Sequence, residues 1–488
     1  MKRAVVVLLL LIANAVFASS EVKPPDSGPG KLLAEWLRAY NGADATALRD
    51  FAEKHLTPEA RDGRPAAAIA QNQIEGRQSS GGFELVKIET SSATELAAIL
   101  KTRSVFPRFL RLSFKVSERD PALITERKVV MLPPLAEALA GQRSAEDLAT
   151  ELDAKFEELA KGERFSGTAL IAKEGKPVWE KAYGLQDREK KMPANLETRF
   201  RLGSMNKMFT SVAIAQLVEA GKLKFGDTLA AVLPDYPNKD VAGKVTIEHL
   251  LTHTAGLGDI FRPGFFFEMK DNIRDHRDWL PVFADQPLEF EPGSRFSYSN
   301  AGFIVLGLVI EKVSGQSYYA YVQQHIFEPV GMTATGSTPA PDRVENLAIG
   351  YTVERSGKPA PNTPSLPWRG MAAGGGESNV GDLLRFATAL RDYKLLSRET
   401  TDLITTGKVE DPPGSASKYA YGFVDRNVNG RRSVGHSGGA PGMNGSLNIL
   451  WDEGYTVVVL ANVDPTVAQD AAEYIADRLP AKARIARQ

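Results

Sequence analysis

The sequence predicts an α+β protein of two folded units, and three observations lead to this prediction. The chain has 488 residues, whereas a single hydrophobic core stops growing at roughly 250 to 300 residues. Its N-terminal part runs from helical into strand-like patterns. The longer remainder has a strand hairpin at each end and helices between them, which favours one antiparallel sheet completed by both ends of that unit.

The first residues have the pattern of a secretory signal. Lys2 and Arg3 precede the apolar run Ala4–Ile12, and Val16-Phe17-Ala18 offers a cleavage site. An uncleaved anchor is the alternative, but the run is shorter than the roughly 20 apolar residues that span a bilayer. We expect a signal peptide at residues 1–18 and a periplasmic or secreted protein whose mature form has no stable membrane span.

The residue composition and net charge of the chain exclude several kinds of partner and several kinds of chemistry. With 59 basic and 60 acidic residues and a net charge of -1, the chain offers no broad positive surface for nucleic acid. The absence of cysteine excludes disulfides, thiol nucleophiles and thiolate ligands. His249 and His253 have the spacing of a zinc-binding helix pair, but no Glu follows His249, so we predict no metal and no cofactor. His253 is interpreted as fixing the turn after its helix, and the expected partner is a small-molecule substrate.

Residues 30–134 are predicted to form an accessory α+β domain, ended by Pro133-Pro134. Its second half shows apolar residues near period two, which indicates strands in a meander. The segment at 94–101 is ambiguous between strand and helix. The predicted helices are Leu32–Tyr40 and Thr46–His55, and the predicted strands are Phe83–Thr90, Phe109–Val116 and Leu123–Leu132.

A helical linker at 135–163 then leads to the second domain at 164–482. Turn residues separate two strands at each end of this domain, and a helix closes it. The predicted elements are the linker helix Ser144–Lys161, the strands Phe165–Ala172, Pro177–Tyr183, Gly445–Trp451 and Tyr455–Ala461, and the helix Thr466–Leu479.

Ser204-Met205-Asn206-Lys207 begins an apolar helical stripe that Gly221 ends. Three residues are almost one helical turn, so Ser204 and Lys207 share a face. A lysine held partly desolvated can accept the serine proton near neutral pH. The same spacing recurs at Ser20 and Ser415, but neither begins a helix. We therefore predict Ser204 as nucleophile and Lys207 as its base.

Two further motifs accompany this pair. Tyr298-Ser299-Asn300 precedes an apolar helix and places a phenol and an amide on one side of a short segment. Gly435-His436-Ser437-Gly438-Gly439 combines small residues, which allow backbone amides to approach a ligand, with a proton-carrying imidazole. The second string also matches a nucleophile elbow centred on Ser437. Such an elbow belongs to the α/β-hydrolase fold, which needs its catalytic histidine after the serine. His436 is the last histidine of the chain, so chain order decides against this alternative.

The order of these motifs resembles the serine β-lactamase and penicillin-binding-protein family, in its class C-like branch, which includes esterases and D,D-peptidases. Leu250–Leu257 and Ala372–Ser378 look like further segments of that family. The resemblance implies a β-lactamase-like α/β/α sandwich with an antiparallel sheet and a helical subdomain. The accessory domain resembles the NTF2-like fold by its element order.

The resemblance also implies roles for the motif residues. Ser204 forms an acyl-enzyme, while Lys207 and Tyr298 move protons. The oxyanion lies between two backbone amides, and removal of one such donor typically costs about 3 kcal/mol of transition-state stabilisation. The implied substrate-binding residues are Asn300 for the acyl side chain, His436 for a carboxylate or a proton relay through Tyr298, Gly438, and Gly439, whose amide shares the oxyanion with that of Ser204.

One departure from the sequence pattern of β-lactamases bears on the substrate. β-Lactamases usually have lysine where this chain has His436, and a histidine neutral at pH 7 attracts a β-lactam carboxylate less. The expected function is hydrolysis of carboxylic esters or D-amino-acid amides and peptides. The alternatives are a penicillin-binding or peptidoglycan-sensing protein with little turnover, and a true β-lactamase. Phe265, Phe266, Phe267 and Trp368 either line the acyl pocket or belong to packing.

Overall fold

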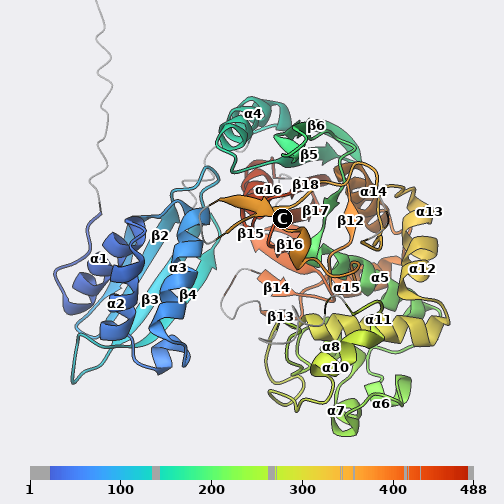
Figure 1. Ribbon diagram of the computed structural model, residues 1–488, viewed down its shortest axis with the longest axis horizontal. Coiled ribbons are helices and arrows are strands. Elements are labelled where there is room, and N and C mark those ends of the chain that lie inside the picture. Colours follow the sequence, from blue (N-terminus) through green and yellow to red (C-terminus); the bar gives the residue numbers. More distant parts are fainter. Residues whose placement is uncertain are drawn as a thin grey trace, which may run out of the picture. The chain divides into compact units, whose positions relative to one another are not determined.

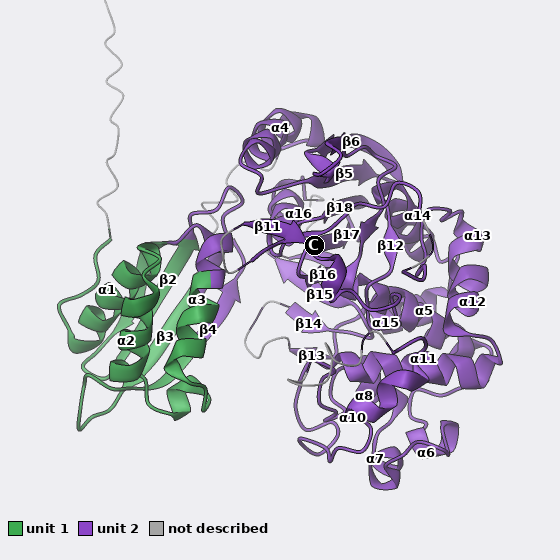
Figure 2. Cartoon of the chain, in the orientation of Figure 1, with its two compact units in different colours: residues 1–74, 83–101, 111–128 green, residues 75–82, 102–110, 129–488 purple. Residues whose placement is uncertain are grey.

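The structure is a computed structural model with two compact units (Figures 1 and 2). The predicted signal peptide and Phe265–Phe267 lie outside the residues that it describes. The first unit holds the chain up to Ile74 with 83–101 and 111–128, and the second holds 75–82, 102–110 and 129–488. The domain boundaries at 134 and 163 stay predictions. The described residues are 22–134, 143–261, 270, 272–340, 342, 344–354, 358–410, 415, 417–428 and 430–481.

The N-terminal part carries a four-stranded sheet in the order β1-β2-β3-β4, with helices over one face (Figure 1). The helices begin where side chains satisfy free amides: Ser27 Oγ accepts from Gly30 N, and Asp44 Oδ1 accepts from Ala47 N. The segment that was ambiguous in sequence is a strand. The elements are α1 (Gly28–Asn41), α2 (Ala45–His55), α3 (Ala66–Ser80), β1 (Phe83–Ser91), β2 (Glu95–Thr102), β3 (Phe109–Val116) and β4 (Ile124–Leu132).

The larger unit is built on an eight-stranded antiparallel sheet in the order β13-β14-β15-β16-β17-β18-β5-β6. The strand β18 pairs with β5, so strands from the two ends of the domain complete one sheet, as predicted. The strands are β5 (Gly167–Lys173), β6 (Lys176–Tyr183), β13 (Val409–Glu410), β14 (Ser417–Tyr419), β15 (Val424–Val428), β16 (Arg431–Ala440), β17 (Met443–Leu450) and β18 (Tyr455–Ala461).

Alternation along the strands divides the core into two layers. Leu170 and Ala172 of β5 pack in one cluster, and Ala169 and Ile171 pack in the other, because successive side chains leave opposite faces of a sheet. One face is covered by α4 (Ala145–Lys161) and α16 (Val467–Arg478). The other is covered by α5 (Asn206–Glu219) and α14 (Val380–Arg391), and α11 (Asn300–Ser314) packs against α5 in the same apolar cluster. The predicted α/β/α sandwich is confirmed.

Short helices and two-stranded pieces between β6 and β13 supply the helical subdomain (Figure 1). Within the described part of the chain, no helix combines the length and apolar character needed to cross a bilayer. The remaining elements are β7 (Leu185–Asp187), β8 (Met192–Pro193), β9 (Phe200–Arg201), α6 (Leu229–Val232), α7 (Lys239–Lys244), α8 (Ile247–Leu251), α10 (Leu280–Phe283), α12 (Tyr318–Val322), α13 (Glu328–Val330), β10 (Tyr351–Val353), β11 (Pro359–Pro361), β12 (Glu377–Ser378) and α15 (Arg398–Thr405).

Candidate active site

Ser204 lies in a short 3-10 turn, η3 (Gly203–Met205), that leads directly into α5. Gly203 has φ +52°, a backbone conformation that favours glycine. It also lies close to β16, because a Cβ built on Gly203 would stand 2.8 Å from Gly439 N. Ser204 itself is half-buried, while Met205 is buried in the core. The turn therefore anchors the serine on one side and leaves the residue partly exposed.

Lys207 has no exposed surface, and its Nζ touches three acceptors. The distances are 3.2 Å to Ser204 Oγ, 2.8 Å to Asn300 Oδ1 and 2.6 Å to the carbonyl oxygen of Ala373. Burial lowers the pKa of Lys207 to about 7, and the charge of Asp259 opposes this shift. A neutral amine has two N–H groups for Asn300 and Ala373 and one lone pair for the serine proton. Lys207 thus has the contacts and the pKa of a general base.

Tyr298 enters the same site from the segment before α11. Its aromatic ring lies 4.9 Å from Lys207 Nζ, and 36% of the residue is exposed. The neighbouring Ser299 fixes the start of α11 by accepting a hydrogen bond from Gly302 N. The structure therefore brings Tyr298 and Asn300 against Lys207, although about ninety residues separate the two motifs in the sequence.

Asn300 is bound at both ends of its amide. Its Oδ1 accepts from Lys207, and its Nδ2 lies 3.1 and 3.2 Å from the two carboxylate oxygens of Asp259. These partners fix the orientation of the amide and connect Lys207 to a carboxylate. Sequence reasoning missed Asp259. The only available signal was its position two residues after Leu257, the end of a segment that had been noted for its family resemblance.

His436 lies on β16, where sequence reasoning expected only a segment preceding the closing hairpin. Its Nδ1 contacts the Ser437 carbonyl oxygen, and its Nε2 is 3.0 Å from the Tyr419 hydroxyl. Burial and the charge of Lys207 lower the pKa of His436 to about 3, so the ring is neutral. Since Nδ1 must donate to the carbonyl, Nε2 accepts from Tyr419. Sequence reasoning paired His436 with Tyr298 and missed Tyr419.

Gly438 and Gly439 bring the end of β16 against the serine turn. A Cβ built on Gly438 would stand 1.9 Å from the Leu202 carbonyl oxygen and 3.0 Å from Ser204 N. Only glycine permits this approach without movement of the backbone. The amides of Ser204 and Gly439 thus belong to two segments in direct contact, which is the arrangement that an oxyanion site of two backbone donors requires.

We expect Gly438→Ala to lower kcat/KM for an ester by at least about tenfold and to lower the unfolding midpoint, because the added methyl group overlaps backbone atoms next to Ser204. Gly226→Ala is the matched control, since a Cβ there meets nothing within 4 Å. Steady-state kinetics and thermal unfolding of both variants check the prediction. Equal behaviour of the two variants would contradict the packing described here.

The third acceptor of Lys207 is held by a separate network. His276 has no exposed surface; its Nδ1 lies 3.2 Å from Glu311 Oε1, and its Nε2 accepts from Ala372 N at 3.0 Å. Ala372 precedes Ala373, whose carbonyl oxygen receives the lysine N–H. A carboxylate and an imidazole therefore fix the segment that positions Lys207. His276 had no recognisable signal in the sequence.

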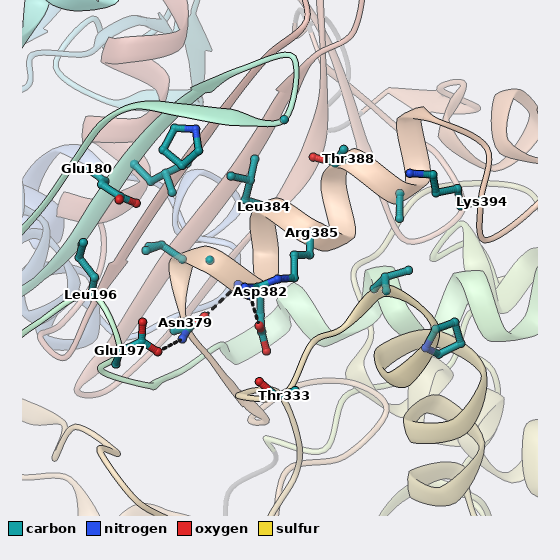
Figure 3. Close-up of a pocket in the computed structure, with 18 residues that line it drawn as sticks. Glu180, Leu196, Glu197, Thr333, Asn379, Asp382, Leu384, Arg385, Thr388 and Lys394 are labelled. Carbon is teal, nitrogen blue, oxygen red and sulfur yellow. Dashed lines mark hydrogen bonds and ion pairs between the residues drawn. The ribbon is translucent and has the colours of Figure 1, made fainter.

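A cavity in the described structure lies apart from this site. It has a volume of about 650 Å³ and lies along α14 (Figure 3). Polar side chains such as Glu197, Asp382 and Arg385 line it, and none of the predicted site residues does. Among the residues that the structure describes, no group of three or more acidic or histidine side chains is arranged to hold a metal ion.

Comparison with known proteins agrees with this fold. The Beta-lactamase family model matches residues 152–481. PbpX of Bacillus subtilis (strain 168), named as a penicillin-binding protein, is 33% identical over 296 residues, which are 61% of this chain and 70% of that protein. The solved structure of a penicillin-binding protein from Bacillus halodurans is 33% identical, covers 65% of this chain and 97% of its own, and has a TM-score of 0.59.

A D-stereospecific amidohydrolase from Streptomyces sp. is 25% identical, covers 67% of this chain and 97% of its own, and has a TM-score of 0.57. Fold and relatives together define the class of protein: a serine hydrolase. The chain belongs to the Beta-lactamase family.

Proposed function

We propose that this protein is an exported hydrolase that forms an acyl-enzyme at Ser204 and acts on carboxylic esters or D-amino-acid amides and peptides. One observation carries the proposal. Lys207 is a fully buried amine 3.2 Å from Ser204 Oγ, with a pKa of about 7. A serine hydroxyl is a weak nucleophile until an adjacent base can take its proton, and Lys207 supplies that base.

The reaction proceeds in two halves. Ser204 Oγ attacks the carbonyl carbon while neutral Lys207 takes the hydroxyl proton, and the amides of Ser204 and Gly439 stabilise the oxyanion. When the intermediate collapses, the leaving alcohol or amine receives that proton by way of Lys207 and Tyr298. Water then attacks the acyl-enzyme and gives a proton to Lys207 and Tyr298. As this second intermediate collapses, the bond from Ser204 Oγ to the acyl carbon breaks, Ser204 Oγ takes the proton back from these groups and the acid is released, so the enzyme returns to its initial state.

The charge of the site supports esters and amides over β-lactams. A β-lactam carries a carboxylate, and the group at the third motif is His436, which burial keeps neutral. A neutral ring attracts an anion less than a fixed ammonium does. Two relatives are named as a penicillin-binding protein and a D-stereospecific amidohydrolase. Their names support an acyl-transfer reaction on amide-like substrates.

Export is the second part of the proposal. It rests on Lys2 and Arg3 before the apolar run Ala4–Ile12. Expression of the full chain in a bacterium, followed by fractionation and N-terminal sequencing of the product, tests it. A product in the periplasm or medium that begins near residue 19 supports export, and an uncleaved cytoplasmic product contradicts it.

A substrate panel tests the function. Purified protein is assayed with a short-chain nitrophenyl ester, with D-alanine and L-alanine nitroanilides, and with a chromogenic cephalosporin. The proposal expects kcat/KM for the ester or the D-anilide to exceed that for the cephalosporin by at least about tenfold. Faster turnover of the cephalosporin would identify a β-lactamase. A long-lived cephalosporin adduct without turnover of any substrate would identify a penicillin-binding protein.

The pH profile of kcat/KM should have an acid limb near pH 7. Lys207 acts as a base only when neutral, so activity rises as pH increases through its pKa of about 7 and falls below it. Initial rates with a neutral ester between pH 5 and 9 report the pKa of the free enzyme. A profile flat from pH 5.5 to 8 would contradict the assignment of Lys207 as base.

Asp259→Asn should move this limb to lower pH. The carboxylate of Asp259 raises the pKa of Lys207, so its removal leaves desolvation less opposed. Asp227→Asn, on a surface turn whose carboxylate accepts only from the Lys224 amide among the described contacts, is the matched control and should leave the limb in place. A shift to higher pH in the Asp259 variant would show that this carboxylate does not act on Lys207 through its charge.

A further inference from the structure

His253 is a buried histidine with an unusual backbone. It follows α8, is 2% exposed and has φ +56°. The left-handed region is sterically unfavourable for a side chain of this size, and glycine or asparagine adopts it more easily. Sequence reasoning gave it the role of fixing the turn after its own helix. The contacts of its side chain lie elsewhere.

Three contacts join His253 to the segment that carries Tyr298. The His253 carbonyl oxygen accepts from Ser297 N at 2.9 Å, and its Nδ1 accepts from Ser299 N at 3.1 Å. Between these two bonds its ring lies against the Tyr298 ring, with 4.1 Å between centroids and 35° between planes. One residue therefore holds the backbone on both sides of the tyrosine and one face of its ring.

The protonation of the ring follows from these contacts. Because Nδ1 accepts a backbone N–H, a neutral imidazole carries its hydrogen on Nε2. Burial, with the nearby Lys207 amine as the second cause, holds the pKa of His253 well below its usual value, which keeps the ring uncharged. Its Nε2 is buried and has no hydrogen-bond partner in the described structure. An unpaired buried N–H donor destabilises the fold. The stabilising contacts of the ring are therefore the hydrogen bond at Nδ1 and the packing of its face against Tyr298.

Neighbouring aromatic side chains also fix the position of the His253 ring. Its centroid is 4.6 Å from that of Tyr419 and 5.2 Å from that of Phe303, so it stands between the tyrosine that binds His436 and the start of α11. These aromatic neighbours restrict rotation of the imidazole. The Tyr298 ring that it supports lies 4.9 Å from Lys207 Nζ.

We propose that His253 is a positioning residue for Tyr298: it sets the backbone of Ser297–Ser299 and the plane of the phenol, and so holds the phenol beside Lys207. The proposal rests on the proposed function, in which Tyr298 passes protons to and from the substrate. It assigns His253 no contact with the substrate, and it predicts that the effect of changing His253 passes through Tyr298.

A double-mutant cycle tests this dependence. His253→Asn keeps a residue that tolerates positive φ but removes the ring. It should lower kcat for a nitrophenyl ester about 10- to 100-fold with KM within about twofold, because the substrate contacts remain. In a Tyr298→Phe background the same substitution should change kcat less than about threefold. His249→Asn, on α8 four residues earlier, is the control and should keep kcat within about twofold in either background.

A second measurement does not depend on activity. In protein labelled with ¹³C-tyrosine, the ring signal of Tyr298, assigned by its loss in Tyr298→Phe, should shift in His253→Asn because the imidazole beside the ring is gone. His249→Asn should leave it unchanged. This readout separates the two proposals: unaltered turnover in Ser204→Ala would overturn the proposed function, yet the shift would still support the positioning role.

Three results would overturn the positioning role. The first is an equal loss of kcat with Tyr298 present and in the Tyr298→Phe background, which would show that His253 acts independently of the tyrosine. The second is an unchanged Tyr298 signal in His253→Asn. The third is failure of both His253→Asn and His253→Gln to fold, which would make the residue a requirement for folding rather than for placing the phenol.

Discussion

Replacing Ser204 by alanine should lower kcat for a nitrophenyl ester by on the order of 10⁴-fold or more, because the variant has no atom that can form the acyl bond. The methyl group fits the half-buried position, so the fold should be retained. What remains is the catalysis that the oxyanion donors and substrate binding provide without a nucleophile. Steady-state rates at matched enzyme concentration measure the effect.

Ser211→Ala is the matched control for this variant. Ser211 lies two turns further along α5, is 1% exposed, and its Oγ has no hydrogen-bond partner in the described structure. It should keep kcat within about threefold of the unaltered protein. If Ser204→Ala kept more than a tenth of the activity, the nucleophile would have to be another residue.

Lys207→Arg should lower kcat by about 10²- to 10⁴-fold, the range that general base catalysis supplies. Arginine keeps the positive charge but does not lose its proton in proteins, so it cannot accept one from Ser204. Lys207→Met, which has a similar length and no charge, should lose activity to a similar extent. The two variants together distinguish a base from a cation, because an electrostatic role alone would leave Lys207→Arg largely active.

Stability provides the control for the lysine variants. Lys207→Met replaces a fully buried amine by an apolar chain, so its unfolding midpoint should stay close to that of the unaltered protein or rise. Lys207→Arg adds volume in a packed site and should lower the midpoint moderately. Activity in Lys207→Arg above about a tenth of the original would contradict the role of base.

Local geometry alone predicted only part of the site. Ser204 and Lys207 are three residues apart at the start of a helix, so their meeting follows from helical spacing alone. Tyr298 and Asn300 needed a resemblance to be linked to them, because nothing local connects two segments so distant in the chain. The structure brings all four together; their roles in catalysis are the proposal made above.

The groups that hold these residues were beyond sequence reasoning. Asp259, Tyr419 and His276 reach the site through long-range contacts, with Asn300, His436 and the Ala372 amide respectively. A single aspartate, tyrosine or histidine has no periodicity or spacing that would mark it. Their contacts depend on how α11, β16 and the glycine-rich segment pack in three dimensions.

The fold elements also differ in how well their own sequence predicts them. The strands β5 and β18 were predicted because their apolar runs are bounded by turn residues, and they belong to one sheet as expected. That the two strands are direct neighbours was not predicted. Helix α3 was missed because its apolar residues are mainly alanine and form no stripe. The strand character of β16 was hidden by its glycines, which weaken a strand in isolation and here permit contact with the serine turn.

The central claim is that a serine made nucleophilic by a buried lysine carries the acyl group. Rapid acid quenching during ester turnover, followed by mass spectrometry of the peptides, tests it most directly. We predict an added acyl mass on the peptide that contains Ser204, and its absence in Ser204→Ala. An acyl group on any other peptide, or turnover at the full rate with no adduct in either protein, would contradict the account.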